Sequence, residues 1–365
     1  MNYRTFRIKK ADLRILIDNL KRSFLLIGPA VDGEVLILKE IDFDHLPSGF
    51  KDFQSPGHYR LVNKRDENIF AFSNGPDSFK RFFHPSVKEV FRFRRTKRGL
   101  QITESPDIST PIAFFGIRSC DVKALKILDM VFSGLERTPY HVMRRNSFII
   151  GLNCLYPGEN CFCSSLDTGP EIKNGCDMII TELKEHLLIE SGVEGIEFIK
   201  GIDYEEASKG DFREKELVVK QCKAMIKRSV NTRELPLKIY RNPEHPQWSR
   251  VSERCLACGN CTQVCPTCFC NSTFDNIDIS SLRRPEGFSG KRIRVWDSCF
   301  SMNFARVHGG NFRPSRRARY RHWLSHKFGY WIDQFGVIGC VGCGRCITWC
   351  PVGIDITEEL EAIGG

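Results

Sequence analysis

The chain has 365 residues, of which 41% are hydrophobic, and its formal net charge is +10. This length exceeds that of one typical domain, so we expect two domains, each with a core of its own. The sequence has no run of eighteen apolar residues and no visible secretory signal, which excludes a membrane-spanning helix and favours a cytoplasmic protein. Because the 17 cysteines are odd in number and the cytoplasm is reducing, we do not expect structural disulfides.

The first part of the chain alternates strand and helix signals, which predicts an α/β domain over residues 1–245. Residues 34–41 and 59–72 have strand character, and the charged stretch 209–227 is typical of a helix. The proline-bearing segment 236–246 is predicted to be the linker.

Two short apolar runs, 112–117 and 148–152, resemble strands inside a sheet that is covered on both faces. A cysteine follows each run, and a Cys-x-Cys pair lies shortly after the second. Ligands gather at the carboxyl ends of strands in open α/β sheets, so these thiols are expected to converge. The sequence therefore predicts a 4Fe-4S cluster on Cys120, Cys154, Cys161 and Cys163.

The alternative for these four cysteines is ordinary packing, since a free cysteine behaves as a small hydrophobe. Packing is the interpretation that we favour for two other cysteines. Cys176 and Cys222 lie in segments with helix-like patterns, 176–180 and 219–226, and we expect both to be packing residues.

The region after residue 245 is dominated by cysteine, glycine and arginine. It contains two near-identical runs, each of the form Cys-x2-Cys-x2-Cys-x3-Cys-Pro, beginning at Cys255 and Cys340. This is the pattern of bacterial two-cluster ferredoxins, in which three thiolates bind one cluster and the fourth binds the other. It predicts a ferredoxin-like domain over residues 246–365 and an overall α+β fold.

The crossed pattern assigns four ligands to each of two 4Fe-4S clusters. The first cluster is assigned to Cys255, Cys258, Cys261 and Cys350, and the second to Cys340, Cys343, Cys346 and Cys265. Gly259 and Gly344 lie where each loop must turn tightly. Zinc is the weaker alternative, because zinc knuckles are separated by a dozen or more residues.

A long insertion, residues 267–339, separates the two runs. It carries Cys268, Cys270 and Cys299, three thiols that could bind a further metal, shield the clusters or simply pack. Its basic, aromatic stretch is better suited to docking a protein than to binding nucleic acid, because no base-reading module accompanies it. The arginines concerned are Arg313, Arg316, Arg317, Arg319 and Arg321.

Several short motifs together resemble one family. These are GIRSCD (116–121), GLNC (151–154), CFC (161–163), CPTCFC (265–270), WDSC (296–299) and HGGN (308–311). They are similar to those of the beta subunit of sulfhydrogenases and the A subunit of anaerobic sulfite reductase. The resemblance implies an iron-sulfur relay between a flavin-containing NAD(P)H-oxidising subunit and a catalytic partner, either a nickel-iron hydrogenase or a sirohaem sulfite reductase.

Two functions stay open at this point. The favoured one is a non-catalytic electron-transfer subunit of an oxidoreductase complex, because no Gly-x-Gly-x-x-Gly or Walker loop provides a nucleotide site. The alternative is a catalytic subunit that acts directly on a sulfur substrate at an iron-sulfur site. A relay needs fully ligated clusters, whereas a catalytic centre keeps an open position.

Overall fold

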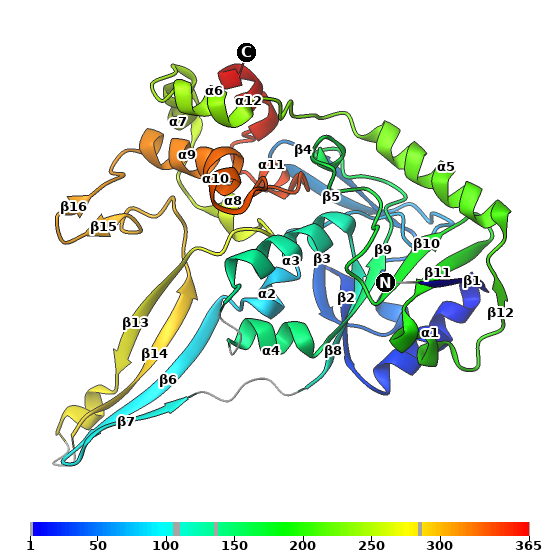
Figure 1. Ribbon diagram of the computed structural model, residues 1–365, viewed down its shortest axis with the longest axis horizontal. Helices are drawn as coiled ribbons and strands as arrows, with labels where there is room; N and C mark the ends of the chain where they lie inside the picture. The colour runs from blue at the N-terminus through cyan, green and yellow to red at the C-terminus, as the bar shows by residue number, and fades with distance from the viewer. Residues whose placement is uncertain (1–2, 105–109, 135–137, 284–286, 365) are drawn as a thin grey trace.

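A mixed eight-stranded sheet forms the body of the computed structural model, which describes residues 3–104, 110–134, 138–283 and 287–364 (Figure 1). Three neighbouring pairs in this sheet are parallel: β2 with β8, β8 with β9, and β9 with β10. The other pairs are antiparallel. In sheet order the strands are β12 (Tyr204–Glu206), β1 (Arg4–Lys9), β11 (His186–Ser191), β10 (Met178–Glu182), β9 (Ser147–Leu152), β8 (Ile112–Ile117), β2 (Leu25–Asp32) and β3 (Val35–Glu40).

Helices pack on both faces of this sheet. On one face α1 (Leu13–Lys21) shares a core with Phe115 and Ile150, and on the other α3 (Ser119–Val131) and α4 (Pro139–Arg145) share a core with Phe114. Successive strand residues thus enter different cores, as the two-residue repeat of a strand requires. All six residues of β8 are buried, which agrees with the predicted doubly covered strand.

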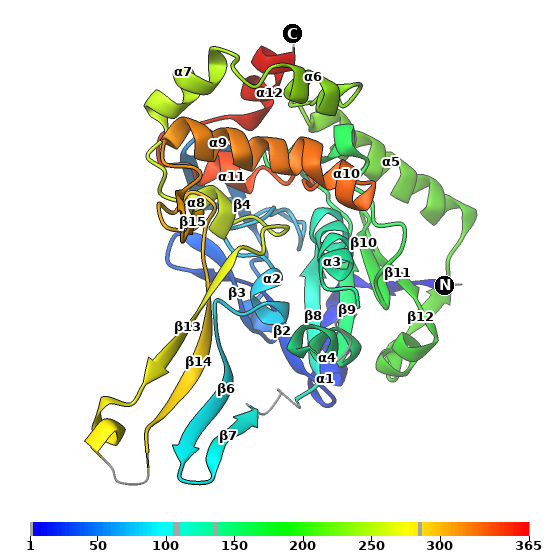
Figure 2. The same cartoon turned by 60° about the vertical axis from the view of Figure 1, so that its left-hand side comes forward.

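The carboxyl ends of the parallel strands β8 and β9 lead directly into the cysteine-rich part of the molecule. Above them lies a helical layer with its own core, which contains Trp248, Tyr320, Trp323 and Phe328 (Figure 2). Its elements are α6 (Leu235–Arg241), α7 (Gln247–Arg254), α8 (Asn260–Gln263), α9 (Arg316–Ser325), the π-helical turn η6 (His326–Tyr330), α10 (Trp331–Phe335), α11 (Arg345–Thr348) and α12 (Ile356–Gly364).

A separate four-stranded antiparallel sheet extends away from the body (Figures 1 and 2). Its strands, in order, are β13 (Asn271–Ile277), β14 (Ser289–Trp296), β6 (Val87–Thr96) and β7 (Gly99–Glu104). The sheet pairs residues 87–104 of the first third of the chain with residues 271–296, which lie between the two cysteine runs. Residues 267–339 therefore contain half of this sheet in addition to the helices α9 and α10.

Apart from α5, the remaining elements are short. They are the hairpins of β4 (Phe50–Ser55) with β5 (His58–Asn63) and of β15 (Arg306–Val307) with β16 (Gly310–Asn311), the helices α2 (Lys80–Phe83) and α5 (Lys209–Met225), and the 3₁₀ turns η1 (Lys10–Asp12), η2 (Phe43–His45), η3 (Cys163–Leu166), η4 (Val193–Ile199) and η5 (Ile279–Arg283). The helix α5 agrees with the prediction for residues 209–227, and β3 with that for 34–41.

Three local predictions are wrong. The strand expected over 59–72 ends at Asn63, because the backbone amides of Ile69 and Phe70 donate to the buried Glu182 carboxylate instead of to a strand. The helix-like segment 176–180 enters strand β10 at Met178. The expected linker 236–246 begins as helix α6, since a proline is tolerated in the first turn of a helix.

Candidate metal centre

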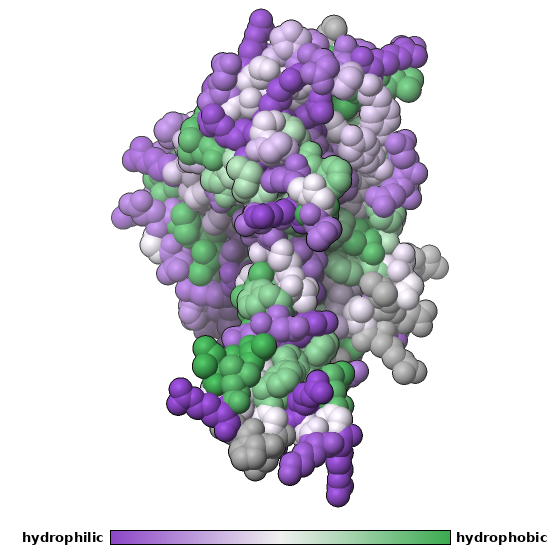
Figure 3. Space-filling view, turned by 90° about the vertical axis from the view of Figure 1, so that its left-hand side faces the viewer, coloured by the Kyte–Doolittle hydropathy of each residue, from purple (hydrophilic) through white to green (hydrophobic). Residues whose placement is uncertain are grey.

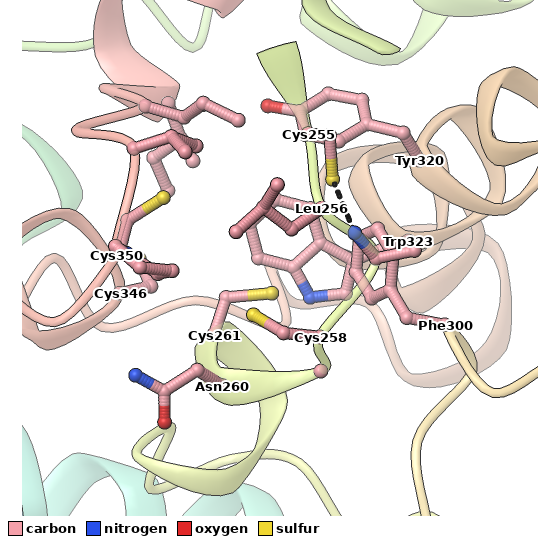
Figure 4. Close-up of a pocket in the computed structure, with 16 residues that line it drawn as sticks. Cys255, Leu256, Cys258, Asn260, Cys261, Phe300, Tyr320, Trp323, Cys346 and Cys350 are labelled. Atoms are coloured by element: carbon pink, nitrogen blue, oxygen red, sulfur yellow. Dashed lines mark hydrogen bonds between the residues drawn. The ribbon is translucent and has the colours of Figure 1, made fainter. Parts of the chain in front are cut away.

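The first cysteine run begins directly after α7, and its third cysteine, Cys261, lies within α8. The thiols of Cys255, Cys258 and Cys261 face one space, and Cys350 lies across it (Figure 4). Aromatic side chains that include Tyr320 line one side of this space. Five cysteines from the two runs line this space: the four that the crossed pattern assigns to the first cluster, and Cys346 of the second set.

The environment of this first set favours a bound cation. Burial, together with the neighbouring Cys255 and Cys350, raises the pKa of the Cys261 thiol well above its ordinary value. Thiolates packed this closely repel one another unless a metal lies between them. Gly259 turns the loop with a φ of +78°, a conformation that favours glycine. The donor set therefore fits an iron-sulfur cluster.

The second set is built in the same way around α11. Burial, and then Cys340, Cys343 and Cys265, raise the pKa of Cys346 well above its usual value. The four thiols are therefore electrostatic neighbours, although Cys265 comes from the other run. Gly344, with a φ of +72°, starts the helical turn that holds Cys346.

A buried lysine contacts the second set. The ammonium group of Lys327, only 4% exposed, donates to the sulfur of Cys265 at 3.3 Å, to the hydroxyl of Thr267 at 3.0 Å and to the carbonyl of Gly339 at 3.2 Å. Burial lowers the pKa of Lys327, but the nearby thiols Cys265, Cys268 and Cys340 raise it well above its usual value. Lys327 is thus a fixed positive charge beside the second set. The sequence marked it only as part of a basic stretch.

The three cysteines of residues 267–339 lie close to the first two sets, since Cys268 is a neighbour of Cys265 and Cys299 is a neighbour of Cys261. Cys268 is hydrogen-bonded to Cys265, and this bond raises the pKa of Cys268 well above its ordinary value. Cys270 is hydrogen-bonded to Cys299, and this bond lowers the pKa of Cys270 to about 7. Two thiol pairs therefore form: Cys268 with Cys265 of the second set, and Cys270 with Cys299.

The third set is assembled from separate elements. Cys120 lies in the first turn of α3, and Cys154 follows β9. Cys161 lies in the loop before η3, and Cys163 is the first residue of η3. Burial, and then Cys163, Cys343 and Cys154, raise the pKa of Cys161 well above its usual value. Cys163 and Cys343 also raise the pKa of Cys120, after burial and Asp121. The topology thus brings together the four cysteines that the sequence predicts as a third site.

A fifth cysteine lies beside this third set. Cys222 of α5 is fully buried, and its pKa is raised first by burial and then by Cys154 and Cys163. The sequence indicates a packing residue at this position, and its burial agrees with that interpretation. Its closeness to the third set had no signal in the sequence, because a single cysteine in a charged helix does not reveal which face it occupies.

The second and third sets are joined by buried polar contacts. Arg345 and Asp121 form an ion pair at 2.8 Å with side chains only 3% and 2% exposed. The amide of Phe162 donates to the carbonyl of Gly342 at 2.8 Å, and a Cβ atom at Gly342 would lie 2.6 Å from the backbone nitrogen of Cys163. Glycine is therefore required where the two loops meet.

The arginines of α9 differ in exposure, so they cannot all belong to the docking surface that the sequence predicts. Arg319 is buried and donates to the carbonyls of Arg313 and Pro314. Arg316 donates to the carbonyl of Cys255, while Arg317 and Arg321 both pair with Glu244. These guanidinium groups stabilise the chain around the first set, and the docking prediction is wrong for Arg319.

Within the described ranges, no group of three or more His, Cys, Asp or Glu side chains is gathered tightly enough to hold a single metal ion. A cubane, by contrast, presents four iron corners, and its thiolates are spread around them. In the same part of the chain, no helix is both long enough and apolar enough to cross a lipid bilayer.

Comparison with known proteins agrees with this geometry. Residues 254–354 match the family model of the 4Fe-4S dicluster domain, a range that includes both cysteine runs. Over 311 residues the chain is 35% identical to sulfhydrogenase 2 subunit beta of Pyrococcus furiosus, covering 84% of this chain and 88% of that protein. The chain belongs to the sulfhydrogenase beta subunit family. Its mixed helix and sheet content, its 4Fe-4S cofactors and its role in iron-sulfur electron transfer are as predicted.

Proposed function

We propose that the chain is a non-catalytic relay that carries electrons between a flavin-containing NAD(P)H-oxidising subunit and a catalytic partner, such as a nickel-iron hydrogenase or a sulfite reductase. The proposal rests on one observation, which is that the three cysteine sets lie in series. Cys346 of the second set is a neighbour of Cys261 in the first, and Cys343 is a neighbour of Cys161 and Cys120 in the third.

We assign a 4Fe-4S cluster to each set, and such clusters accept and release one electron at a time. The chain would supply four thiolates per site, with Cys265 and Cys350 crossing between the two ferredoxin-type sites. Eleven of the twelve assigned cysteines are buried or partly buried, Cys258 being exposed, and Lys327 and Arg345 place positive charge near the thiolates. These features suit storage and passage of electrons without chemistry at the sulfur ligands.

We also propose two structural units, an α/β domain over residues 1–245 and a ferredoxin-like domain over 246–365 with the insertion 267–339. Contacts between them are extensive. Besides the Arg345–Asp121 ion pair, Thr348 donates to the Gln54 side chain at 2.8 Å and accepts from Asn160 at 2.8 Å. The two units would therefore act as one electron-transfer body. A cytoplasmic location remains a prediction.

The relay is tested with the purified, partner-free chain after anaerobic reconstitution. We expect it to accept electrons from an artificial donor. By itself it should neither oxidise NAD(P)H nor reduce sulfite. Co-purification from the native host should then identify the flavin and catalytic subunits. Robust turnover of a sulfur substrate by the isolated chain would contradict the relay and would indicate catalysis at Cys268, Cys270 and Cys299.

A further inference from the structure

The four-stranded sheet that extends from the body is called the arm here, and it consists of β6, β7, β13 and β14. Figures 1 and 2 both show it projecting beyond the remaining elements. At its base the indole N–H of Trp296 donates to the carbonyl of His84 at 2.8 Å. A projecting sheet exposes both of its faces, so the side chains on these faces determine what the arm can bind.

One face of the arm carries an apolar row across all four strands. Ile102 is paired with Phe93, Phe93 with Gly290, and Gly290 with Ile277. Residues directly opposite one another in a sheet point to the same face. The Phe93 ring lies over Gly290, where a Cβ atom would come within 2.7 Å of it. Leu100 lies two residues from Ile102 and extends the row.

This apolar row faces solvent. Leu100 is 59% exposed, Ile102 57% and Ile277 42%. Figure 3 shows hydrophobic side chains gathered on the protruding lower part of the molecule, with hydrophilic side chains beside them. Contiguous exposed apolar surface of this kind marks an interaction site in a folded protein.

The arm is also basic. Residues 87–104 and 271–296 contain eleven Lys and Arg but only five Asp and Glu, so they carry +6 of the total net charge of +10. Arg95, Lys97 and Arg98 lie around the β6–β7 turn and are exposed. An apolar centre with a charged rim is the usual composition of a protein interface.

We propose that the arm docks an acidic surface of another subunit of the same electron-transfer assembly. This inference rests on the proposed relay function, since a relay must be held against its donor or acceptor. A second copy of this chain would bring the same positive charge and be repelled, whereas an acidic partner gains attraction and orientation.

The position of the arm suits this role. β13 begins directly after Cys270, and the amide of Asp297, at the end of β14, donates to the carbonyl of Cys270 at 3.0 Å. Cys270 is also a neighbour of Cys268, which contacts Cys265 of the second set. A subunit seated against the base of the arm therefore lies close to the second cysteine set.

The test uses the full chain, tagged and purified from its native host with its assembly. The variant Leu100→Glu/Ile102→Glu places two carboxylates in the apolar row, and we expect at least about a tenfold loss of associated subunits. The matched control is Val193→Glu, which changes an 83% exposed valine of η4 outside the arm and should leave the assembly intact. Iron content should be equal in both variants and wild type.

A second measurement identifies the chemistry of the partner. Carbodiimide couples amines to nearby carboxylates, so it should link Lys97 or Lys291 to Asp or Glu residues of one associated subunit. Arg95→Glu/Arg98→Glu should weaken association, and more strongly at low salt than at high salt.

Three results would overturn the proposal. One is an assembly that persists in Leu100→Glu/Ile102→Glu. Another is self-association of the purified wild-type chain that only this variant abolishes, since that would show a second copy on the arm. The third is an intact assembly combined with loss of binding to a single-stranded oligonucleotide probe. If the wild-type chain co-purifies with no other subunit, the relay function itself fails, which is a distinguishable outcome.

Discussion

The two ferredoxin-type sets and the strand-end set contain the same ligands but are built differently. Each ferredoxin-type run places its thiols within eleven residues, and only the last cysteine crosses to the other run. The strand-end set draws Cys120, Cys154, Cys161 and Cys163 from a helix, a strand end and a loop. The first kind of site depends on local spacing, whereas the second depends on the sheet that brings parallel strand ends together.

This difference predicts how each site responds to damage. A change in one run should affect the cluster to which that cysteine belongs and little else. A change in the contacts between the body and the second run should affect the third set and the stability of the whole chain, because the second run packs directly against the loop of Cys161 and Cys163.

The largest effect is expected from Cys265→Ala. It removes one thiolate from the second set and should eliminate or degrade that cluster, with a loss of up to about four iron atoms. The cluster of Cys255, Cys258, Cys261 and Cys350 should persist in the electron paramagnetic resonance spectrum of the reduced protein. Cys176→Ala, which alters a buried cysteine in another core, is the control. Loss of the first cluster's signal instead would refute the crossed ligation.

Breaking the ion pair between the two regions should have the next largest effect. Arg345→Met leaves the Asp121 carboxylate buried without its partner, so we expect the free energy of unfolding to fall by about 3–5 kcal/mol. Chemical denaturation followed by circular dichroism measures it. Glu206→Gln removes an exposed pair with Arg4 and should cost no more than about 1 kcal/mol. Equal losses in the two variants would show that the buried pair does not hold the regions together.

Removing the lysine beside the second set should have a smaller effect. Lys327→Met deletes a positive charge hydrogen-bonded to Cys265, which disfavours the more negative reduced cluster and lowers its reduction potential. We expect a shift on the order of 50 mV, since about 59 mV corresponds to 1.4 kcal/mol for a one-electron couple. Lys327→Arg should retain most of the potential. A redox titration in which both variants match wild type would remove Lys327 from this role.

The sequence predicts the parts of this molecule that depend on short spacing. The two cysteine runs, the turns at Gly259 and Gly344 and the buried strand β8 all follow local patterns. What it does not predict is where side chains go after the chain has folded. Lys327 and Arg319 belong to a basic stretch in the sequence, yet both are buried in the structure.

Long-range pairing is equally hidden in the sequence. Neither β6 nor β13 contains a signal that identifies its sheet neighbours, because strand register depends on which faces become buried. The nearness of Cys222 to the third set has the same origin, since α5 is distant in sequence from Cys154 and Cys163. Such features depend on tertiary packing, so they are visible only in the folded structure.

The central claim is that three cysteine sets hold three clusters in series, and the iron content of the anaerobically reconstituted chain tests it most directly. We predict about twelve iron atoms in the wild type and about eight in Cys154→Ala or Cys161→Ala, with Cys222→Ala remaining near twelve. An iron content near eight in the wild type that none of these substitutions changes would contradict the account.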